Sequence, residues 1–476
     1  MRKTLIIIAA MLAAACSPKN EKQVYIPKDL QEMDLSDTSS LWCYERSAEN
    51  DDLVFFWQKG FGPDLATAPD YLGHNMKVDL PNLMERAQYF YDFFKNDLGF
   101  IQPGSKADIY KMMVMLMYSD EGTAYGGDYD ETIGGLWVTP LRTYEKNLNV
   151  IAHELGHSFQ SQLSLDTDSG FGGGGIYEMT SQWMLWNANE DWMTSENYHW
   201  QAFMDQTQFA FMHPDNMYRS PYVLEYWSDK HGLKFIGDLW RAAKHRHDVI
   251  QVYEEFTGID DYQFGQEMYE YAAKSMTYDF DRVREIAAPY ANQHRGKLEA
   301  ADAQGWRRIS QGQEPQQYGY NGIALDVPAP GTKISVNLRG EMPYLGPMKR
   351  MVNSYEIPEE VDGSVGAEMT DSEDKPNLPK ADVPTREEAL ESASSGAAWT
   401  FGLVGVKADG TPIYSESQSV VYEGMGWQNP LEFTVPSDEP LAHLWLVVVA
   451  TPHHHVDVLE WNNDYLLYFP YTIHIE

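Results

Sequence analysis

The spacing of apolar residues changes near residue 300, and this change limits most strongly what the chain can fold into. Before it, apolar side chains recur every three or four positions, which predicts helices with one buried stripe. One such stripe consists of Leu83, Ala87, Phe90, Tyr91 and Phe94. After Trp306 apolar and polar residues alternate, as in Ile334, Val336 and Leu338, which predicts strands. A chain with both periods in separate halves is expected to form two domains.

The first domain is predicted over residues 41–300 and the second over residues 301–476. The first is mostly helical, but two apolar runs, Lys111–Tyr118 and Gly134–Thr139, predict strands, so an α+β fold is expected. In the second, Asp409-Gly410 between alternating runs predicts a hairpin, and the whole predicts a β-sandwich. Residues 359–395 are rich in Asp, Glu, Pro and Ser and predict a low-complexity insertion at its surface.

The N-terminus has the three parts of a signal peptide. Arg2 and Lys3 precede an apolar run over residues 5–12, and small residues follow up to Cys16. Small residues next to a cysteine resemble a bacterial lipobox, which implies a signal peptide over residues 1–16 and a lipid on Cys16. An ordinary signal peptide with an incidental cysteine is the alternative. The polar residues 17–40 are expected to be a tether between the lipid and the folded chain.

The composition excludes several classes of partner and site. The formal net charge of −36 argues against nucleic acid and against direct contact with an anionic membrane surface. Membrane contact is therefore expected through the N-terminal lipid alone. Only Cys43 remains after Cys16, so no disulfide within the mature chain and no cysteine-based zinc site is expected.

The string His153-Glu154-Leu155-Gly156-His157 carries the strongest chemical signal. In a helix, His153 and His157 project from the same face one turn apart, so both imidazoles can reach one Zn²⁺ ion. Glu154 emerges beside them without ligating the metal. Zinc lowers the pKa of a bound water to about 7, and Glu154 is placed to act as general base.

A catalytic zinc ion needs a third protein ligand. A metzincin would have Gly at position 160 and His at position 163, but this chain has Gln160 and Leu163. Glu178, on a predicted second helix after the glycine run 172–175, is the preferred third ligand. Asp166, Asp168 and Glu190 are the alternatives.

This arrangement resembles the gluzincins, the thermolysin-like superfamily of zinc peptidases whose third ligand is a Glu on the following helix. The motif and the short gap are closest to enhancin-like and mucin-active peptidases and to a group of secreted bacterial lipoproteins. The resemblance implies a zincin-like catalytic domain, an α+β fold that is mostly helical, followed by the all-β sandwich. Thermolysin-like enzymes often have an acid four residues after the ligand Glu, whereas this chain has Gln182, which can still orient a ligand histidine.

The same resemblance implies an edge strand that binds the substrate backbone and a donor for the developing oxyanion. Gly135 and Trp137 are the candidates on the strand, although Trp137 can equally be a core residue. Tyr218 is the candidate donor, with Tyr222, Tyr226 and His231 as alternatives. The adjacent histidines 453–455 point to different sides of the chain and are expected at the surface rather than on a shared ion.

The sequence therefore predicts a zinc peptidase of the cell envelope, anchored by lipid to the outer membrane on its periplasmic or outer side. Its substrates would be proteins, peptides or glycoproteins, and Zn²⁺ its cofactor. The alternative is a surface lipoprotein that binds glycans or proteins on a zincin scaffold without catalysis, through its many aromatic rings.

Overall fold

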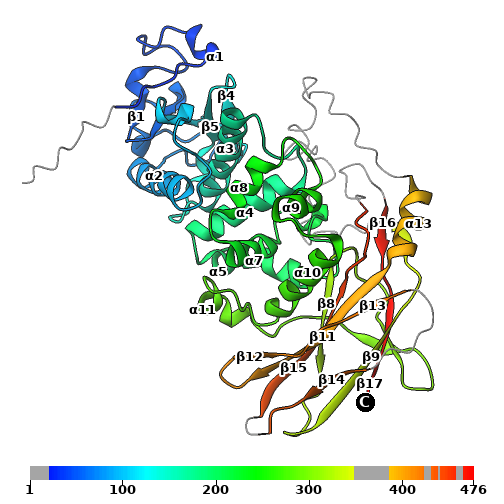
Figure 1. Cartoon of the computed structure of the whole chain (residues 1–476). Coiled ribbons are helices and arrows are strands. Elements are labelled where there is room, and N and C mark those ends of the chain that lie inside the picture. The colour runs from blue at the N-terminus through cyan, green and yellow to red at the C-terminus, as the bar shows by residue number, and fades with distance from the viewer. Residues whose placement is uncertain (1–20, 348–384, 423–429, 438–439, 457–464) are drawn as a thin grey trace, which may run out of the picture.

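The computed structural model describes residues 21–347, 385–422, 430–437, 440–456 and 465–476. A mixed sheet with helices forms the first domain and a β-sandwich forms the second (Figure 1). Within the described ranges, no helix is long and apolar enough to cross a membrane. The expected signal peptide over residues 1–16 and its Cys16 lie outside the described residues.

The sheet of the first domain has five strands. In spatial order they are β1 (Ser47–Glu49), β2 (Leu53–Trp57), β3 (Met112–Leu116), β5 (Ile133–Val138) and β4 (Ala124–Tyr129). Strands β2, β3 and β5 are parallel, whereas β4 runs antiparallel to β5 at the edge. All residues of β3 are buried, as expected for a central strand covered on both faces. Both predicted strands are confirmed.

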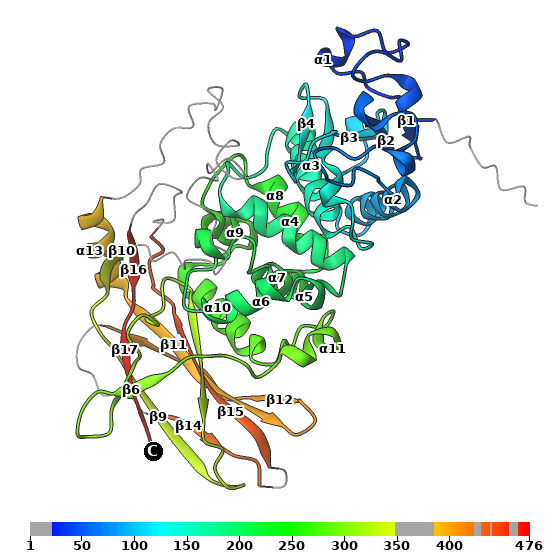
Figure 2. The same ribbon diagram turned by 180° about the vertical axis from the view of Figure 1, so that it is seen from behind.

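Helices fill the rest of this domain. They are α1 (Lys28–Gln31), α2 (Leu80–Asn96), α3 (Asn149–Thr167), α4 (Gly175–Ala188), α5 (Trp192–Ser195), α6 (Asn197–Met204), α7 (Tyr222–His231), α8 (Phe235–Ala242), α9 (Val249–Thr257), α10 (Asp261–Ser275) and α11 (Arg284–Ala287). Helix α2 begins after Asp79, whose carboxylate accepts from the Asn82 N–H, and buries the predicted stripe. Figure 2 shows α4, α7, α8, α9 and α10 between the mixed sheet and the sandwich.

The prediction that residues 17–40 form a tether is wrong for residues 21–40. Gln23 extends the sheet region by exchanging backbone hydrogen bonds with Ile109 and Lys111. Leu30 and Leu35 are buried in the core of the first domain. The two buried leucines and the backbone pairing thus bind residues 21–40 to the first domain, although the overall composition of this segment is polar.

The second domain is a sandwich, as predicted. One sheet has the order β12 (Pro412–Tyr414), β11 (Ala398–Lys407), β15 (Leu441–Ala450), β8 (Tyr320–Leu325), with β13 (Gln418–Val421) also paired to β11. The other has the order β14 (Leu431–Thr434), β9 (Lys333–Gly340), β17 (Tyr471–Ile475), β7 (Arg307–Ile309), β6 (Leu298–Ala300). Strands β10 (Tyr344–Pro347) and β16 (Tyr465–Tyr468) pair separately. The predicted hairpin at Asp409-Gly410 joins β11 to β12, with Gly410 at φ +88°.

Two predicted boundaries of this domain change. Strand β6 pairs with β7, so the sandwich begins before residue 301. Residues 385–395, predicted to belong to the insertion, lie in or next to α13 (Arg386–Gly396), whose Ala389 and Ala393 are buried in the sandwich core. Small alanines on one face let a polar helix pack closely there. Residues 359–384 lie outside the described residues.

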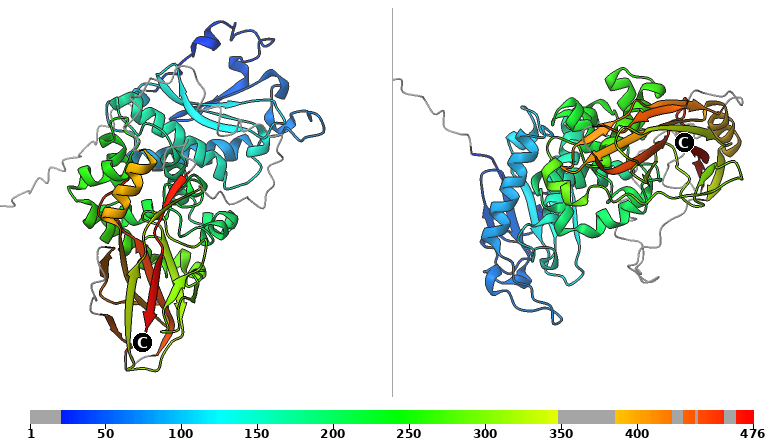
Figure 3. Two further views of the ribbon diagram at one scale, coloured as in Figure 1. Left: turned by 90° about the vertical axis from the view of Figure 1, so that its right-hand side faces the viewer. Right: turned by 90° about the horizontal axis from the view of Figure 1, so that it is seen from below.

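The two domains share a continuous apolar interface. Val404, Val406, Trp445, Val447 and Val449, on β11 and β15, belong to the core of the first domain. Helix α10 packs against both strands. Two further views show the sandwich extending from the helical side of the first domain, away from the mixed sheet (Figure 3).

A cluster of titratable groups joins the domains at one end of this interface. His455 donates from its backbone N–H to Asp261, and its Nε2 lies 2.9 Å from Asp248 Oδ2. His454 is exposed and the His453 ring meets Tyr262, so the three histidines do point to different sides, but His455 is a bridging residue rather than a free surface one.

We expect this cluster to make stability depend on pH. Burial, and then the hydrogen bond and charge of Asp261, raise the pKa of Glu254 to about 8. The folded protein therefore keeps a proton that the unfolded chain has lost, and stability falls as pH rises from about 4.5 to 8. Glu254→Gln keeps a donor to Asp261 but cannot ionise. Because Glu254 is partly exposed, solvent screening reduces the expected effect. We expect the substitution to raise the free energy of unfolding by about 1–2 kcal/mol at pH 8.5 and not at all at pH 4. Urea unfolding of wild type and Glu254→Gln at the two pH values measures this difference in free energy of unfolding. The same difference at both pH values would contradict a raised pKa of Glu254.

Candidate metal centre

A close crossing of α3 and α4 brings the predicted ligands together. A Cβ atom on Gly156 would lie 2.5 Å from the Ser181 hydroxyl oxygen, so only glycine allows this approach. The Ser181 hydroxyl donates to the His153 carbonyl oxygen at 2.7 Å. Glu178 is one turn before Ser181 and therefore faces the two histidines.

Three ligand atoms meet at one point. Glu178 Oε2 lies 3.0 Å from His153 Nε2 and 3.1 Å from His157 Nε2, and the two imidazole nitrogens are 3.1 Å apart. Ligands 2.0–2.1 Å from a tetrahedral zinc ion would be about 3.3 Å from one another. Among the described residues, this is the one group of three or more His, Cys, Asp or Glu with metal-ligand spacing. The alternatives are elsewhere: Asp166 accepts from Gln162, and Asp168 and Glu190 are exposed.

Two glutamines fix the orientation of the imidazoles. Gln182 Nε2 donates to the Tyr218 carbonyl oxygen, so its Oε1 faces His153 Nδ1 at 2.8 Å. Gln160 Nε2 likewise donates to the Tyr177 carbonyl oxygen, and its Oε1 faces His157 Nδ1 at 3.0 Å. Each Nδ1 must carry the hydrogen, which leaves each Nε2 with a lone pair. The predicted contact of Gln182 is confirmed, whereas the matching role of Gln160 was missed.

The converging lone pairs require a positive charge between them. Two imidazole nitrogens and a carboxylate oxygen repel one another unless a cation or a proton is shared. Burial lowers the pKa of His157, but the charge and hydrogen bond of Glu178 outweigh burial and raise it to about 9. Burial acts to raise the pKa of Glu178, but His157 and His153 hold it well below its usual range. The donor set and spacing fit a zinc ion.

Glu154 lies beside this group, under the edge strand β4. The Gly126 N–H donates to the Glu154 carboxylate, and burial raises the pKa of Glu154 above its ordinary value. A Cβ atom on Gly126 would lie 1.9 Å from the Glu154 carbonyl oxygen and 2.9 Å from the His157 Cβ atom. Strand β4 can therefore lie this close to α3 only because residue 126 has no side chain.

The prediction that Gly135 and Trp137 belong to an edge strand is wrong. Both are on β5, which is paired on both sides, by β3 and by β4. Gly126 faces α3 and is paired with Leu136, so the next residue, Trp137, faces away from α3. Its ring stacks on Tyr125, and its Nε1 donates to the Tyr129 hydroxyl. The sequence did not distinguish the edge strand, because both strands contain glycine pairs.

Tyr218 is the one proposed oxyanion donor that reaches the ligands. Its ring centroid is 6.0 Å from that of His153, and its hydroxyl hydrogen-bonds the Glu178 carboxylate. Burial, and then Glu178, raise the pKa of Tyr218 well above its usual value, so the phenol stays protonated. Tyr222 is a core residue, and Tyr226 and His231 hydrogen-bond Glu270 and Tyr253 instead.

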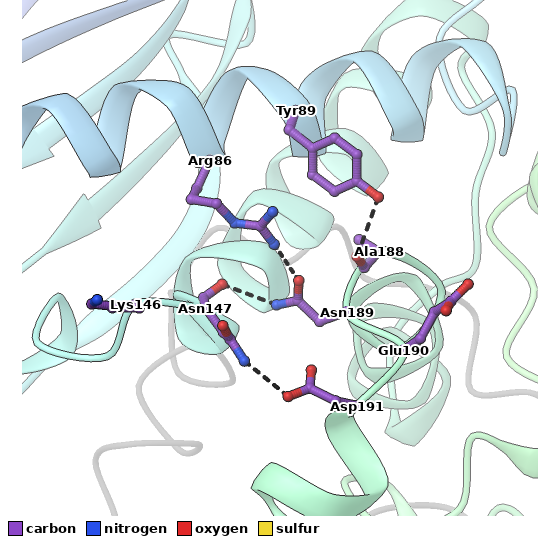
Figure 4. Close-up of a pocket in the computed structure, with 8 residues that line it drawn as sticks. All are labelled: Arg86, Tyr89, Lys146, Asn147, Ala188, Asn189, Glu190 and Asp191. Carbon is purple, nitrogen blue, oxygen red and sulfur yellow. Dashed lines mark hydrogen bonds between the residues drawn. The ribbon is translucent and has the colours of Figure 1, made fainter. Parts of the chain in front are cut away.

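A separate surface hollow of about 600 Å³ lies between α2, the segment before α3 and the end of α4 (Figure 4). Its lining consists of Arg86, Tyr89, Lys146, Asn147, Ala188, Asn189, Glu190 and Asp191. Asn189 donates to the Asn147 carbonyl oxygen and accepts from Arg86, and Asn147 donates to Asp191. These polar groups bind one another across the hollow and so fasten α4 to α2.

The chain matches, over residues 16–476, the family described as a family of unknown function (DUF6055). The chain belongs to this family. No curated protein and no solved structure matches it. The description of DUF6055 assigns no activity.

Proposed function

We propose that this member of DUF6055 is a zinc-dependent peptidase of the gluzincin type, with a zincin-like catalytic domain. His153, His157 and Glu178 would hold the ion. The observation that carries the proposal is that both histidine Nε2 lone pairs and the Glu178 carboxylate converge. Gln182 and Gln160 fix the tautomers of the two histidines through hydrogen bonds at their Nδ1 atoms. A bound Zn²⁺ ion would supply Lewis acidity, polarising a carbonyl group and acidifying water.

The remaining chemistry belongs to the chain's own side chains. Glu154 accepts the proton of the attacking water and returns it to the leaving amine, and the Gly126 N–H orients its carboxylate. Tyr218 keeps its phenolic proton and donates it in a hydrogen bond to the oxygen on which negative charge develops. The open edge of β4 would bind the substrate backbone by strand addition.

The proposed substrates are proteins, peptides or glycoproteins outside the cytoplasm. This part of the proposal rests on the sequence signals for export and for a lipid on Cys16, which would hold the enzyme at the outer membrane through the lipid alone. Its high negative charge gives no support for nucleic acid as a partner.

Metal removal tests the proposal directly. Purified protein is expected to contain about one zinc ion per chain and to cleave members of a peptide and glycoprotein library. Stripping by a chelator should abolish cleavage, and added Zn²⁺ should restore it. Absence of stoichiometric metal would exclude both the peptidase and a zinc-containing binding protein. Zinc without cleavage would favour the binding lipoprotein.

A further inference from the structure

Gln182 contacts two parts of the proposed active site at once. It is buried on α4, one turn after Glu178. Its Oε1 accepts from His153 Nδ1 at 2.8 Å, while its Nε2 donates to the Tyr218 carbonyl oxygen, also at 2.8 Å. One amide therefore connects a metal ligand to the backbone of the oxyanion donor.

The segment that carries Tyr218 is a turn that contacts α4. It lies between α6, which ends at Met204, and α7, which begins at Tyr222, and residues 217–221 form turns rather than a helix or strand. Tyr218 is bound to α4 at two points, through its carbonyl oxygen by Gln182 and through its hydroxyl by Glu178. When the Tyr218 hydroxyl donates to a substrate oxygen, its hydrogen bond to Glu178 is lost. The hydrogen bond from Gln182 to the Tyr218 carbonyl oxygen remains and still holds the backbone.

We infer that Gln182 is a positioning residue for Tyr218 as well as for His153, and that its amide, rather than a carboxylate, is needed for this second role. The inference rests on the proposed function for what Tyr218 does in the reaction. An amide accepts on one side and donates on the other, whereas a carboxylate can only accept. A carboxylate at this position would satisfy His153 but would set an acceptor against the Tyr218 carbonyl oxygen.

The substitution Gln182→Glu separates the two roles. Zinc affinity should stay within about threefold of wild type, because a carboxylate is a good partner for a ligand imidazole. Turnover should fall about 10- to 100-fold with KM unchanged, because the oxyanion donor is no longer held in place. Gln182→Leu removes both contacts, so it should lower zinc affinity about 10- to 100-fold as well.

Hydrogen exchange gives a measurement that does not need activity. In Gln182→Glu the peptides covering residues 205–221 should exchange about tenfold faster, in zinc-loaded and zinc-free protein alike, while those of α3 stay as in wild type. Gln160→Glu is the matched control, because Gln160 donates to the Tyr177 carbonyl oxygen instead. Exchange in residues 205–221 should not change in that variant.

A double-mutant cycle with Tyr218→Phe completes the test. If Gln182 acts through Tyr218, the double variant with Gln182→Glu and Tyr218→Phe has a turnover no lower than that of Tyr218→Phe alone. The inference would be overturned if the reductions in turnover of the two single variants multiplied in the double variant. Unchanged hydrogen exchange in residues 205–221 of Gln182→Glu would also overturn it. If the wild type cleaves nothing, the proposed function fails, but the exchange comparison still decides whether Gln182 positions Tyr218.

Discussion

Glu154→Gln should reduce the cleavage rate about 10²- to 10⁴-fold without loss of zinc. The substituted amide keeps an oxygen that can accept the Gly126 N–H, so the local structure is preserved. It cannot take a proton from water, however, and the step that needs a general base is lost. The measurement compares initial cleavage rates of wild type and variant on the best library substrate, with the zinc content of both determined by mass spectrometry.

Glu190→Gln is the matched control for this change of charge. Glu190 is exposed at the rim of the hollow in Figure 4 and is not one of the three proposed metal ligands. Its substitution should leave cleavage within about twofold of wild type, as for most surface sites. If Glu154→Gln behaved like this control, Glu154 would not be the base, and the peptidase proposal would lose its catalytic residue.

Gly126→Ala should impair both the fold and the activity. The added methyl group would lie 1.9 Å from the Glu154 carbonyl oxygen, so β4 must move away from α3. Overpacking of this kind costs about 1–3 kcal/mol. The same movement displaces the N–H that orients Glu154, so we expect cleavage to fall at least about 100-fold, in line with the sensitivity of catalysis to small misplacements.

Gly127→Ala provides the comparison on the adjacent residue. Its methyl group would meet only the Trp137 ring, at 3.9 Å, on the other face of the sheet. Urea unfolding should give a free energy within about 0.5 kcal/mol of wild type for this variant. Equal destabilisation by the two alanines would show that β4 does not lie against α3 as the structure has it.

The sequence alone predicted the parts of the site that depend on local spacing. Histidines four residues apart on a helix must share a face, so His153 and His157 needed no tertiary information. The prediction of Glu178 as the third ligand required only a second helix that packs back against the first. The glycine run 172–175 indicated a connection that allows this packing. The change of apolar period likewise predicted the order of the two domains, because helices and strands bury residues at different intervals.

Only the tertiary structure decided which strand lies over the candidate metal centre. Strands β4 and β5 each contain a glycine pair. Which of them is the edge strand depends on the neighbours of each strand, and no local pattern records these neighbours. For the same reason residues 21–40 were predicted to be part of a tether and residues 385–395 part of a surface insertion. Leu30, Ala389 and Ala393 instead pack into cores formed by distant segments. The position of Tyr218 beside Glu178, and the amide of Gln182 that holds it there, likewise depend on contacts across about 40 residues of chain, which periodicity cannot specify.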